Sequence, residues 1–125
     1  MNERILHVEV GKPPEYHLER AARMMEALER GEQPEPYHAI GFADLRQFLA
    51  IFNPYRWEAL AALREGGPMT VAELARRVRR DDKNVRGDVE KLIEWQALVE
   101  DEQGRLIAPY SEIVVDVCLP QREAA

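Results

Sequence analysis

The sequence predicts an α+β fold that is mainly α-helical. In several segments apolar residues recur every three or four positions, short branched apolar runs lie near both ends, and Gly, Pro and Asn separate these segments. The chain has 125 residues, of which 46% are hydrophobic and 32% are charged, so it can form one core with a soluble surface. We therefore expect one compact domain with an appendage.

The first 40 residues predict a strand followed by a helix. Ile5 to Val10 is rich in branched apolar residues and precedes a Gly-Lys-Pro-Pro turn. A helix should follow and stop near Gly31. Its apolar positions recur at helical spacing, at Leu18, Ala21, Ala22, Met25 and Leu28. With the proline-spaced linker that follows, residues 1–40 are expected to form an arm that contacts a second subunit, a partner protein or its own domain.

Two more helices are expected before residue 68. The first has large apolar residues at spacings of three and four, namely Phe42, Leu45, Phe48, Leu49 and Phe52. Asn53 and Pro54 end it and begin the next, from Tyr55 to Glu65, which stops at Gly66-Gly67-Pro68. The expected buried side of this next helix is Trp57, Leu60, Ala61 and Leu63.

Residues 69–99 are typical of a helix-turn-helix. Thr70 and Glu73 have the spacing of a capping box, which fixes the start of a short helix. A charged turn follows, and Asp81 or Asp82 can cap the next helix, which runs to about Gln96. The core stripes of the two helices are Val71, Leu74, Ala75 and Val78 in the first and Val85, Val89, Leu92 and Ile93 in the second.

A hairpin is expected after this pair of helices. Residues 98–100 and 105–108 predict two short strands, and Gly104 permits the positive φ of a tight turn. A last strand is expected from the alternation of Ile113, Val115, Val117 and Leu119. Residues 41–120 therefore predict a winged helix-turn-helix domain, with residues 121–125 as a tail.

Basic residues concentrate in this unit, because residues 76–86 hold six basic and two acidic side chains. A last helix that fits the major groove, braced by the helix before it, is the DNA-reading arrangement of this motif. We expect contacts to the DNA backbone from Arg76, Arg77, Arg79 and Arg80. We expect contacts to bases or phosphates from Lys83, Asn84, Arg86 and Lys91, and a minor-groove contact from Arg105.

A plainer alternative is a solvated charged face. In that case the arginines pair with Glu73, Asp81 and Asp82 and bind no DNA. Asp101 and Glu102 also count against Arg105, because they would repel phosphate.

Other functions find little support in the sequence. The net charge of −6 argues against sequence-blind nucleic-acid binding. Cys118 is the only cysteine and the histidines at 7, 17 and 38 lack ligand spacing, so we expect no metal and no cofactor. Adjacent carboxylates lie in predicted surface turns, so we expect no enzyme. No apolar run reaches the ~20 residues that span a bilayer, and the N-terminus lacks the pattern of a signal peptide, so we expect a cytoplasmic protein without a membrane partner.

Residues 42–117 resemble the archaeal and bacterial family of predicted transcriptional regulators with a MarR-like winged helix-turn-helix domain. The resemblance lies in an R-x-x-x-L-x-x-L helix, the segment VAELARRV, the pattern D-x-K-N-V-x-x-D-V-x-x-L and a P-Y-x-x-I strand. It implies a DNA-binding winged helix with Lys83, Asn84 and Arg86 in its recognition helix. Where relatives often have a basic residue before the Asp, this chain has Gly87.

The expected function is that of a sequence-specific DNA-binding regulator, a repressor that acts as a homodimer on double-stranded DNA. Some members of the resembled family are antitoxins, which implies a first alternative. In that alternative the N-terminal arm neutralises a cognate toxin and the protein regulates its own operon. A second alternative is a winged-helix protein-interaction module that does not bind DNA.

Overall fold

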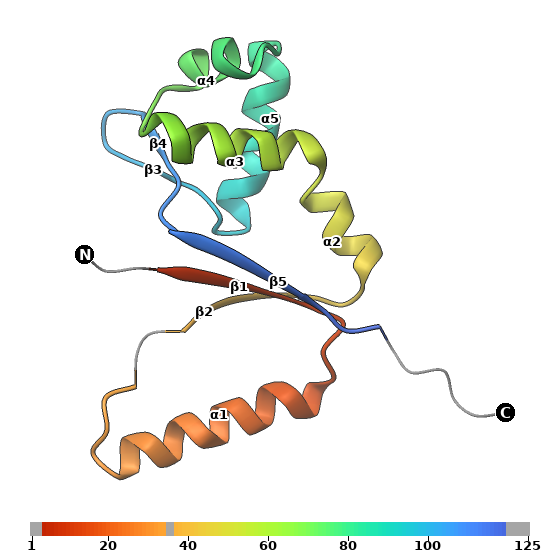
Figure 1. Ribbon diagram of the computed structural model, residues 1–125, viewed down its shortest axis with the longest axis vertical. Coiled ribbons are helices and arrows are strands. Elements are labelled where there is room, and N and C mark those ends of the chain that lie inside the picture. Colours follow the sequence, from red (N-terminus) through yellow and green to blue (C-terminus); the bar gives the residue numbers. More distant parts are fainter. Residues whose placement is uncertain (1–3, 35–36, 120–125) are drawn as a thin grey trace, which may run out of the picture.

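The computed structural model describes residues 4–34 and 37–119 and has an α+β architecture. In the described residues, the helices and short strands follow one another in the order β1-α1-β2-α2-α3-α4-α5-β3-β4-β5 (Figure 1). The helices are α1 (Pro14–Glu29), α2 (Leu45–Ile51), α3 (Pro54–Gly66), α4 (Val71–Val78) and α5 (Asp82–Glu94). The strands are β1 (Ile5–Val10), β2 (His38–Phe42), β3 (Val99–Glu100), β4 (Leu106–Ile107) and β5 (Glu112–Val117).

The main sheet is parallel and has the order β2-β1-β5. β1 is the middle strand, and its Val8 lies beside Ile40 of β2 and Val115 of β5. Figure 1 shows α1 on one side of this sheet and α2 to α5 on the other. The first and last strands of the chain therefore meet in one sheet.

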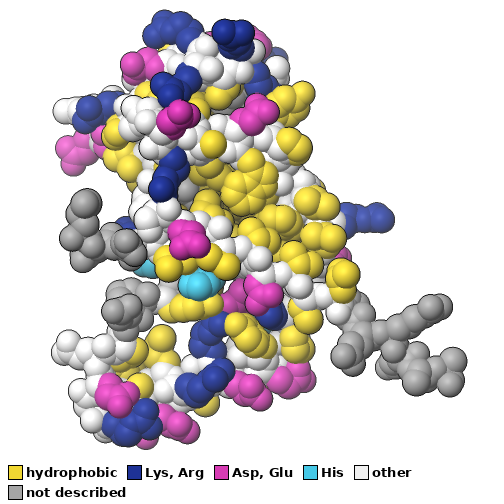
Figure 2. Space-filling view, viewed as in Figure 1, with side chains coloured by type: hydrophobic (Ala, Val, Ile, Leu, Met, Phe, Trp, Pro, Cys, Tyr) yellow, Lys and Arg dark blue, Asp and Glu magenta, His cyan; other side chains and the backbone are white. Residues whose placement is uncertain are grey.

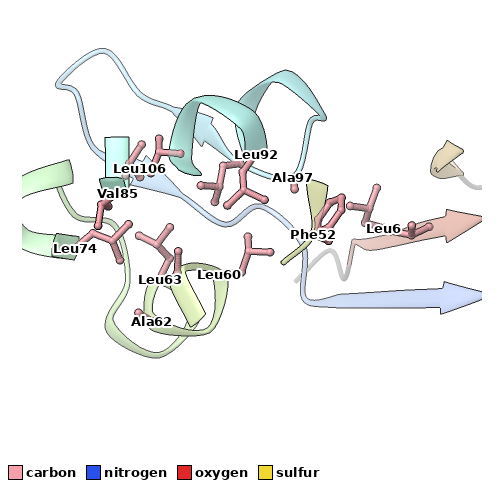
Figure 3. Packing of buried hydrophobic residues seen from close by; sticks show 14 of the residues in the cluster. Leu6, Phe52, Leu60, Ala62, Leu63, Leu74, Val85, Leu92, Ala97 and Leu106 are labelled. Atoms are coloured by element: carbon pink, nitrogen blue, oxygen red, sulfur yellow. The ribbon is translucent and has the colours of Figure 1, made fainter. Parts of the chain in front are cut away.

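One hydrophobic core joins the sheet to the helices. Leu6 and Val8 on β1 are fully buried beneath α2 and its neighbours, where Phe52 is also buried. Figure 3 shows this core continuing from Leu6 and Phe52 to Leu74 and Val85 at its far end. The sheet and the helices therefore share one hydrophobic interior.

The expected boundary at residue 40 falls within β2. β1 pairs along both of its edges, so the strand of the expected arm is built into the sheet and does not form a separate unit. Residues 38–42 form a strand, whereas the sequence suggested a linker up to residue 40 and a helix that includes Phe42. The helix, α2, starts at Leu45, where Asp44 caps it by accepting from the Gln47 amide at 2.9 Å.

The apolar residues of α1 face away from the sheet. α1 has no buried residue, and Leu18, Met25 and Leu28 are all more than half exposed. Its sheet side is polar instead, because Arg20 forms an ion pair with Glu9, a carboxylate on β1 that is only 3% exposed. The Tyr37 hydroxyl also donates to Glu9, at 3.0 Å. Burial, followed by this hydrogen bond to the Glu9 carboxylate, raises the pKa of Tyr37 to about 12.

Most of the expected core stripes are confirmed. Leu74 and Ala75 on α4, and Val85, Val89 and Leu92 on α5, are buried. The expected buried side of α3 was wrong at one position, because Ala61 is exposed and Trp57 is only half-buried. The buried residues of α3 are Ala59, Leu60, Ala62 and Leu63. The helix is thus turned slightly from the orientation that its large side chains suggested.

The expected hairpin is also present, as β3 and β4, and the last strand is β5. Cys118, just after β5, is half-buried. Within residues 4–34 and 37–119, no helix has the length and apolar character needed to cross a membrane. The tail predicted at residues 121–125 lies outside the described residues.

Candidate nucleic-acid interface

The start of α4 is fixed by the predicted capping box. The Thr70 hydroxyl accepts from the Glu73 amide at 3.2 Å, and the Glu73 carboxylate accepts from the Thr70 amide at 3.0 Å. The second of these bonds, from the backbone, and then the contact with the Thr70 side chain hold the pKa of Glu73 below its usual 4.5. Glu73 is therefore committed to the helix end and is not a partner for the arginines that follow.

The turn between α4 and α5 is sharp because Arg79 has a left-handed backbone conformation. Its φ of 58° and ψ of 49° are uncommon for a residue other than glycine. This conformation ends α4 and lets the Arg79 and Arg80 amides bond to Arg76 and Ala75 carbonyls, at 3.3 and 3.0 Å. α5 then begins at Asp82, directly after Asp81. Asp81 has the N-cap position without making a side-chain cap bond.

A buried carboxylate on α5 ties three helices together. Asp88 is 7% exposed and lies on the inward side of α5. Its Oδ1 accepts from Arg56 Nε of α3 at 2.9 Å, and its Oδ2 is paired with Arg80 from the turn. Arg56 Nη1 also donates to the Ile51 carbonyl at the end of α2, at 2.8 Å. The network fixes the position of α5 relative to α2 and α3.

This network changes the role of one predicted DNA contact. Arg80 was expected to contact the DNA backbone, but its side chain is only 21% exposed. In addition to pairing with Asp88, its guanidinium lies 4.0 Å from the centre of the Tyr55 ring. Arg80 is therefore a structural residue that holds the turn, and its charge is largely compensated inside the protein.

Five other predicted residues are exposed at the end of α4 and the start of α5. Their side chains have no hydrogen bond or ion pair with any other residue that the structure describes. Figure 2 shows Lys and Arg side chains gathered at the top of the molecule, over α4 and the first turns of α5, with some acidic side chains among them. We call this group the cationic end; its members are Arg76, Arg79, Lys83, Asn84 and Arg86.

Two further predicted contacts, Lys91 and Arg77, form ion pairs within the protein. Lys91 Nζ lies 3.0 Å from Glu94 Oε2, one turn further along α5. Arg77 has a looser ion pair with Glu65, at 3.8 Å. Both pairs are exposed, and surface ion pairs of this kind contribute little stability, so each cation can still leave its partner.

The hairpin β3-β4 is held at its turn by Asp101. The Asp101 carboxylate accepts from the Gln103 and Arg105 amides, both at 2.9 Å, and from Arg105 Nε at 3.0 Å. The Arg105 amide bond, followed by that of Gln103, lowers the pKa of Asp101. Arg105 therefore stabilises the hairpin turn in which it lies. To contact DNA, its side chain would have to break its ion pair with Asp101.

Two residues of this region were not singled out from the sequence. Asp88 and Arg56 received no role, although both lie in the motifs that carry the family resemblance. The signal for Asp88 was its spacing, because it falls among Val85, Val89 and Leu92 on the inward side of α5, where an acidic residue needs a buried partner. No comparable pattern indicated which arginine would supply it.

The architecture from the end of α2 to the start of β5 corresponds to a known family. The HVO_A0114 family model matches residues 51–115, which include α3, α4, α5 and the hairpin. The chain belongs to the HVO_A0114 family. The matched segment contains the cationic end and the Arg56–Asp88–Arg80 network, whereas β1, α1 and β2 lie before it. Membership of the HVO_A0114 family defines this domain without giving it an activity.

No curated protein and no solved structure matches the chain. Among the described residues, no group of three or more His, Cys, Asp or Glu side chains is arranged to hold a metal ion. The chemical character of the site therefore rests on its exposed cations.

Proposed function

We propose that residues 54–107 form a winged helix-turn-helix that binds double-stranded DNA, and that the protein is a sequence-specific cytoplasmic regulator. In this proposal it represses by occupying a promoter as a homodimer. The observation that carries the proposal is the cationic end: four cations and Asn84, all exposed and without described partners, on an acidic protein. The relation to MarR-like regulators remains part of the proposal and rests on the sequence motifs alone.

The dimensions of α5 support this proposal. Its 13 residues make a helix about 20 Å long, and the major groove is about 12 Å wide, so its first turns can enter the groove end-on. Lys83, Asn84 and Arg86 then lie nearest the bases, while Arg76 and Arg79 lie nearest the phosphates. Gly87 contributes no side chain, which limits base reading to the first turn and a half.

The buried network supports the proposal in a second way. A reading helix must be held at a fixed angle, since base contacts depend on the position of each side chain. Asp88 fixes α5 from its inward side, one turn after the exposed Asn84 and across the helix from Arg86.

One observation favours the antitoxin alternative. The outward side of α1 exposes Leu18, Met25 and Leu28, and Glu15 and Glu26 flank them. An exposed apolar stripe with an acidic border suits a partner with a basic surface. Any such contact would use the helix, because the two edges of β1 are already paired.

Fluorescence anisotropy with a labelled duplex from the upstream region of the gene tests the proposed DNA contacts. The double variant Lys83→Ala/Arg86→Ala should weaken binding at least tenfold. The charge-matched control is Arg23→Ala/Arg46→Ala, which removes two exposed cations on α1 and α2, outside the cationic end, and it should change binding less than threefold. Equal effects of the two variants would contradict the proposed reading surface.

A further inference from the structure

β5 forms one outer edge of the parallel sheet, and that edge has no partner among the described residues. Its side chains are unusually apolar for an open edge. Val114, Val115 and Val117 are 37%, 36% and 41% exposed, and Leu119, two residues after the strand, is 69% exposed. Long apolar edge strands of this kind tend to pair with another chain. The opposite edge, β2, is shorter and contains Gly41, so it is the weaker template.

The backbone hydrogen bonds between β5 and β1 show which N–H and C=O groups of β5 point away from β1. The Cys118 amide donates to the Val10 carbonyl of β1 at 2.8 Å. Since successive residues of a strand direct their backbone groups to opposite sides, the N–H and C=O groups of Ile113, Val115 and Val117 are directed to the open edge. Residues 113, 115 and 117 can therefore form a second ladder.

We propose that β5 pairs antiparallel with β5 of a second copy of this chain, about a two-fold axis at Val115. In this register Asp116 lies opposite Val114, and Glu112 lies opposite Cys118. The two neighbouring registers that keep the ladder are unfavourable. One sets Glu112 opposite Asp116, and the other sets Asp116 opposite its own copy, and like charges directly opposite destabilise a strand pair. The positions of the acidic residues therefore disfavour both neighbouring registers, and with the axis at Val115 a second copy pairs along β5 without like charges directly opposite.

A cavity beside β5 supports the same register. It has a volume of about 250 Å³, lies on the helical side of the sheet, and is lined by Trp57, Leu60, Ser111 and Ile113 among others. The Val115 axis brings Leu119 of the second copy, two residues beyond the end of its β5, next to Ser111 at the edge of this cavity. Figure 2 shows hydrophobic side chains gathered across this part of the surface. The pairing would cover them and bring an exposed leucine to the cavity.

The arrangement has a consequence for DNA, and this consequence rests on the proposed function. An axis perpendicular to the sheet keeps the helical layers of both copies on the same side of a continuous six-stranded sheet. The cationic end lies far from the sheet in each copy (Figure 1). Both reading helices would therefore approach the same DNA molecule, as two half-sites require.

Light scattering on the full chain without DNA tests the pairing. We expect a mass of twice 14.4 kDa. Val115→Pro removes only an N–H that points to the open edge, so this variant should be a monomer with an unchanged circular dichroism spectrum. A monomeric wild type at 50 µM, or a variant that folds and stays dimeric, would overturn the proposal.

Cysteine cross-linking tests the register and does not depend on the proline variant. In a Cys118→Ser background, Val115→Cys should form an intermolecular disulfide, because residues paired at the axis have Cα atoms about 5.5 Å apart. Val117→Cys is the matched control, since its two copies would lie roughly 14 Å apart and should stay reduced. Cross-linking at 117 and not at 115 would overturn the register. Because no DNA is present, failure of the pairing is distinct from failure of DNA binding.

Discussion

At the scale of single residues, the most constrained side chain of the candidate interface is Asp88. It is a buried acidic residue of α5, and its two carboxylate oxygens form ion pairs with Arg56 and Arg80. A buried charge pair adds little stability relative to apolar residues, but loss of one partner leaves uncompensated charge in the interior. Asp88 therefore governs both the stability of the domain and the position of α5.

Asp88→Ala should lower the free energy of unfolding by about 3 kcal/mol, since it leaves two arginines without their carboxylate. Urea denaturation followed by circular dichroism measures this. Glu90→Ala, an exposed acidic residue on the same helix, is the control and should change stability by less than about 0.5 kcal/mol. A loss for Asp88→Ala no larger than for the control would mean that the network is not needed.

Gly87 offers a test of the reading surface, because a side chain at this position would enter open space, with no other atom within 4 Å of its Cβ. Gly87→Ala should stabilise α5 by up to about 1 kcal/mol, since alanine favours helix. Gly87→Arg should gain similar stability and also bind DNA more tightly, because it adds a cation beside Arg86. Anisotropy titrations of the two variants separate the effect of charge from that of helix stability. If Gly87→Arg bound no more tightly than Gly87→Ala, this part of the helix would not face DNA.

The sequence was most informative for residues whose role is local and least for those that depend on a distant partner. The exposed side chains of Lys83, Asn84 and Arg86 follow from helical periodicity alone. Arg80 was assigned to DNA because it lies in a basic run, but its partners Asp88 and Tyr55 come from other parts of the fold. A basic residue in the sequence is a candidate DNA contact. Only the fold shows whether its charge is already paired with another residue of the protein.

At the scale of elements, α4 depends on its N-terminal cap. The helix has only eight residues, so the two bonds of the Thr70–Glu73 box satisfy a large share of its free amides. Such a short helix has little stability of its own, and its cap and its packing must hold it.

Thr70→Ala should lower the free energy of unfolding by about 1 kcal/mol at pH 7, because it removes the acceptor for the Glu73 amide. Thr70→Ser keeps a hydroxyl at the same position and should lose much less. Thermal unfolding of the three proteins provides the measurement. Equal melting temperatures would show that packing alone holds the helix.

The same box predicts a dependence on pH. The pKa of Glu73 is below 4.5 in the folded protein, so its contribution is fully present above about pH 4.5 and is lost as the pH falls through the folded-state pKa. Glu73→Ala should therefore melt below the wild type at pH 7, and the difference should shrink toward pH 3. A difference that stays constant from pH 7 to pH 3 would contradict a charged cap.

Helices and caps were predictable because they are encoded by neighbouring residues, whereas the parallel sheet was not. β1 pairs with β5 across more than a hundred residues, beginning with Ile5 beside Glu112. The strand of the expected arm has its partners in β2 and β5, a pairing within its own domain that no local pattern indicated. β2 was missed because HAIGF has no clear alternation and contains a glycine.

At the scale of the whole molecule, the distribution of charge decides how DNA binding can work. The protein carries a net charge of −6, and the cationic end is a small basic region on it. Non-specific attraction to DNA is then weak, and affinity must come from a few well-placed contacts, doubled if two copies bind together. Dimerisation through β5 would therefore strengthen DNA binding by doubling the number of contacts.

A competition titration tests directly whether the protein binds a specific DNA sequence. The purified full chain is titrated into a labelled duplex from the upstream region of its own gene, with a scrambled duplex of equal length as competitor, at several salt concentrations. We expect at least a hundredfold preference for the upstream duplex, and a slope of log K against log salt of roughly −4 or steeper. Equal binding to the two duplexes, or no binding at low salt, would contradict it.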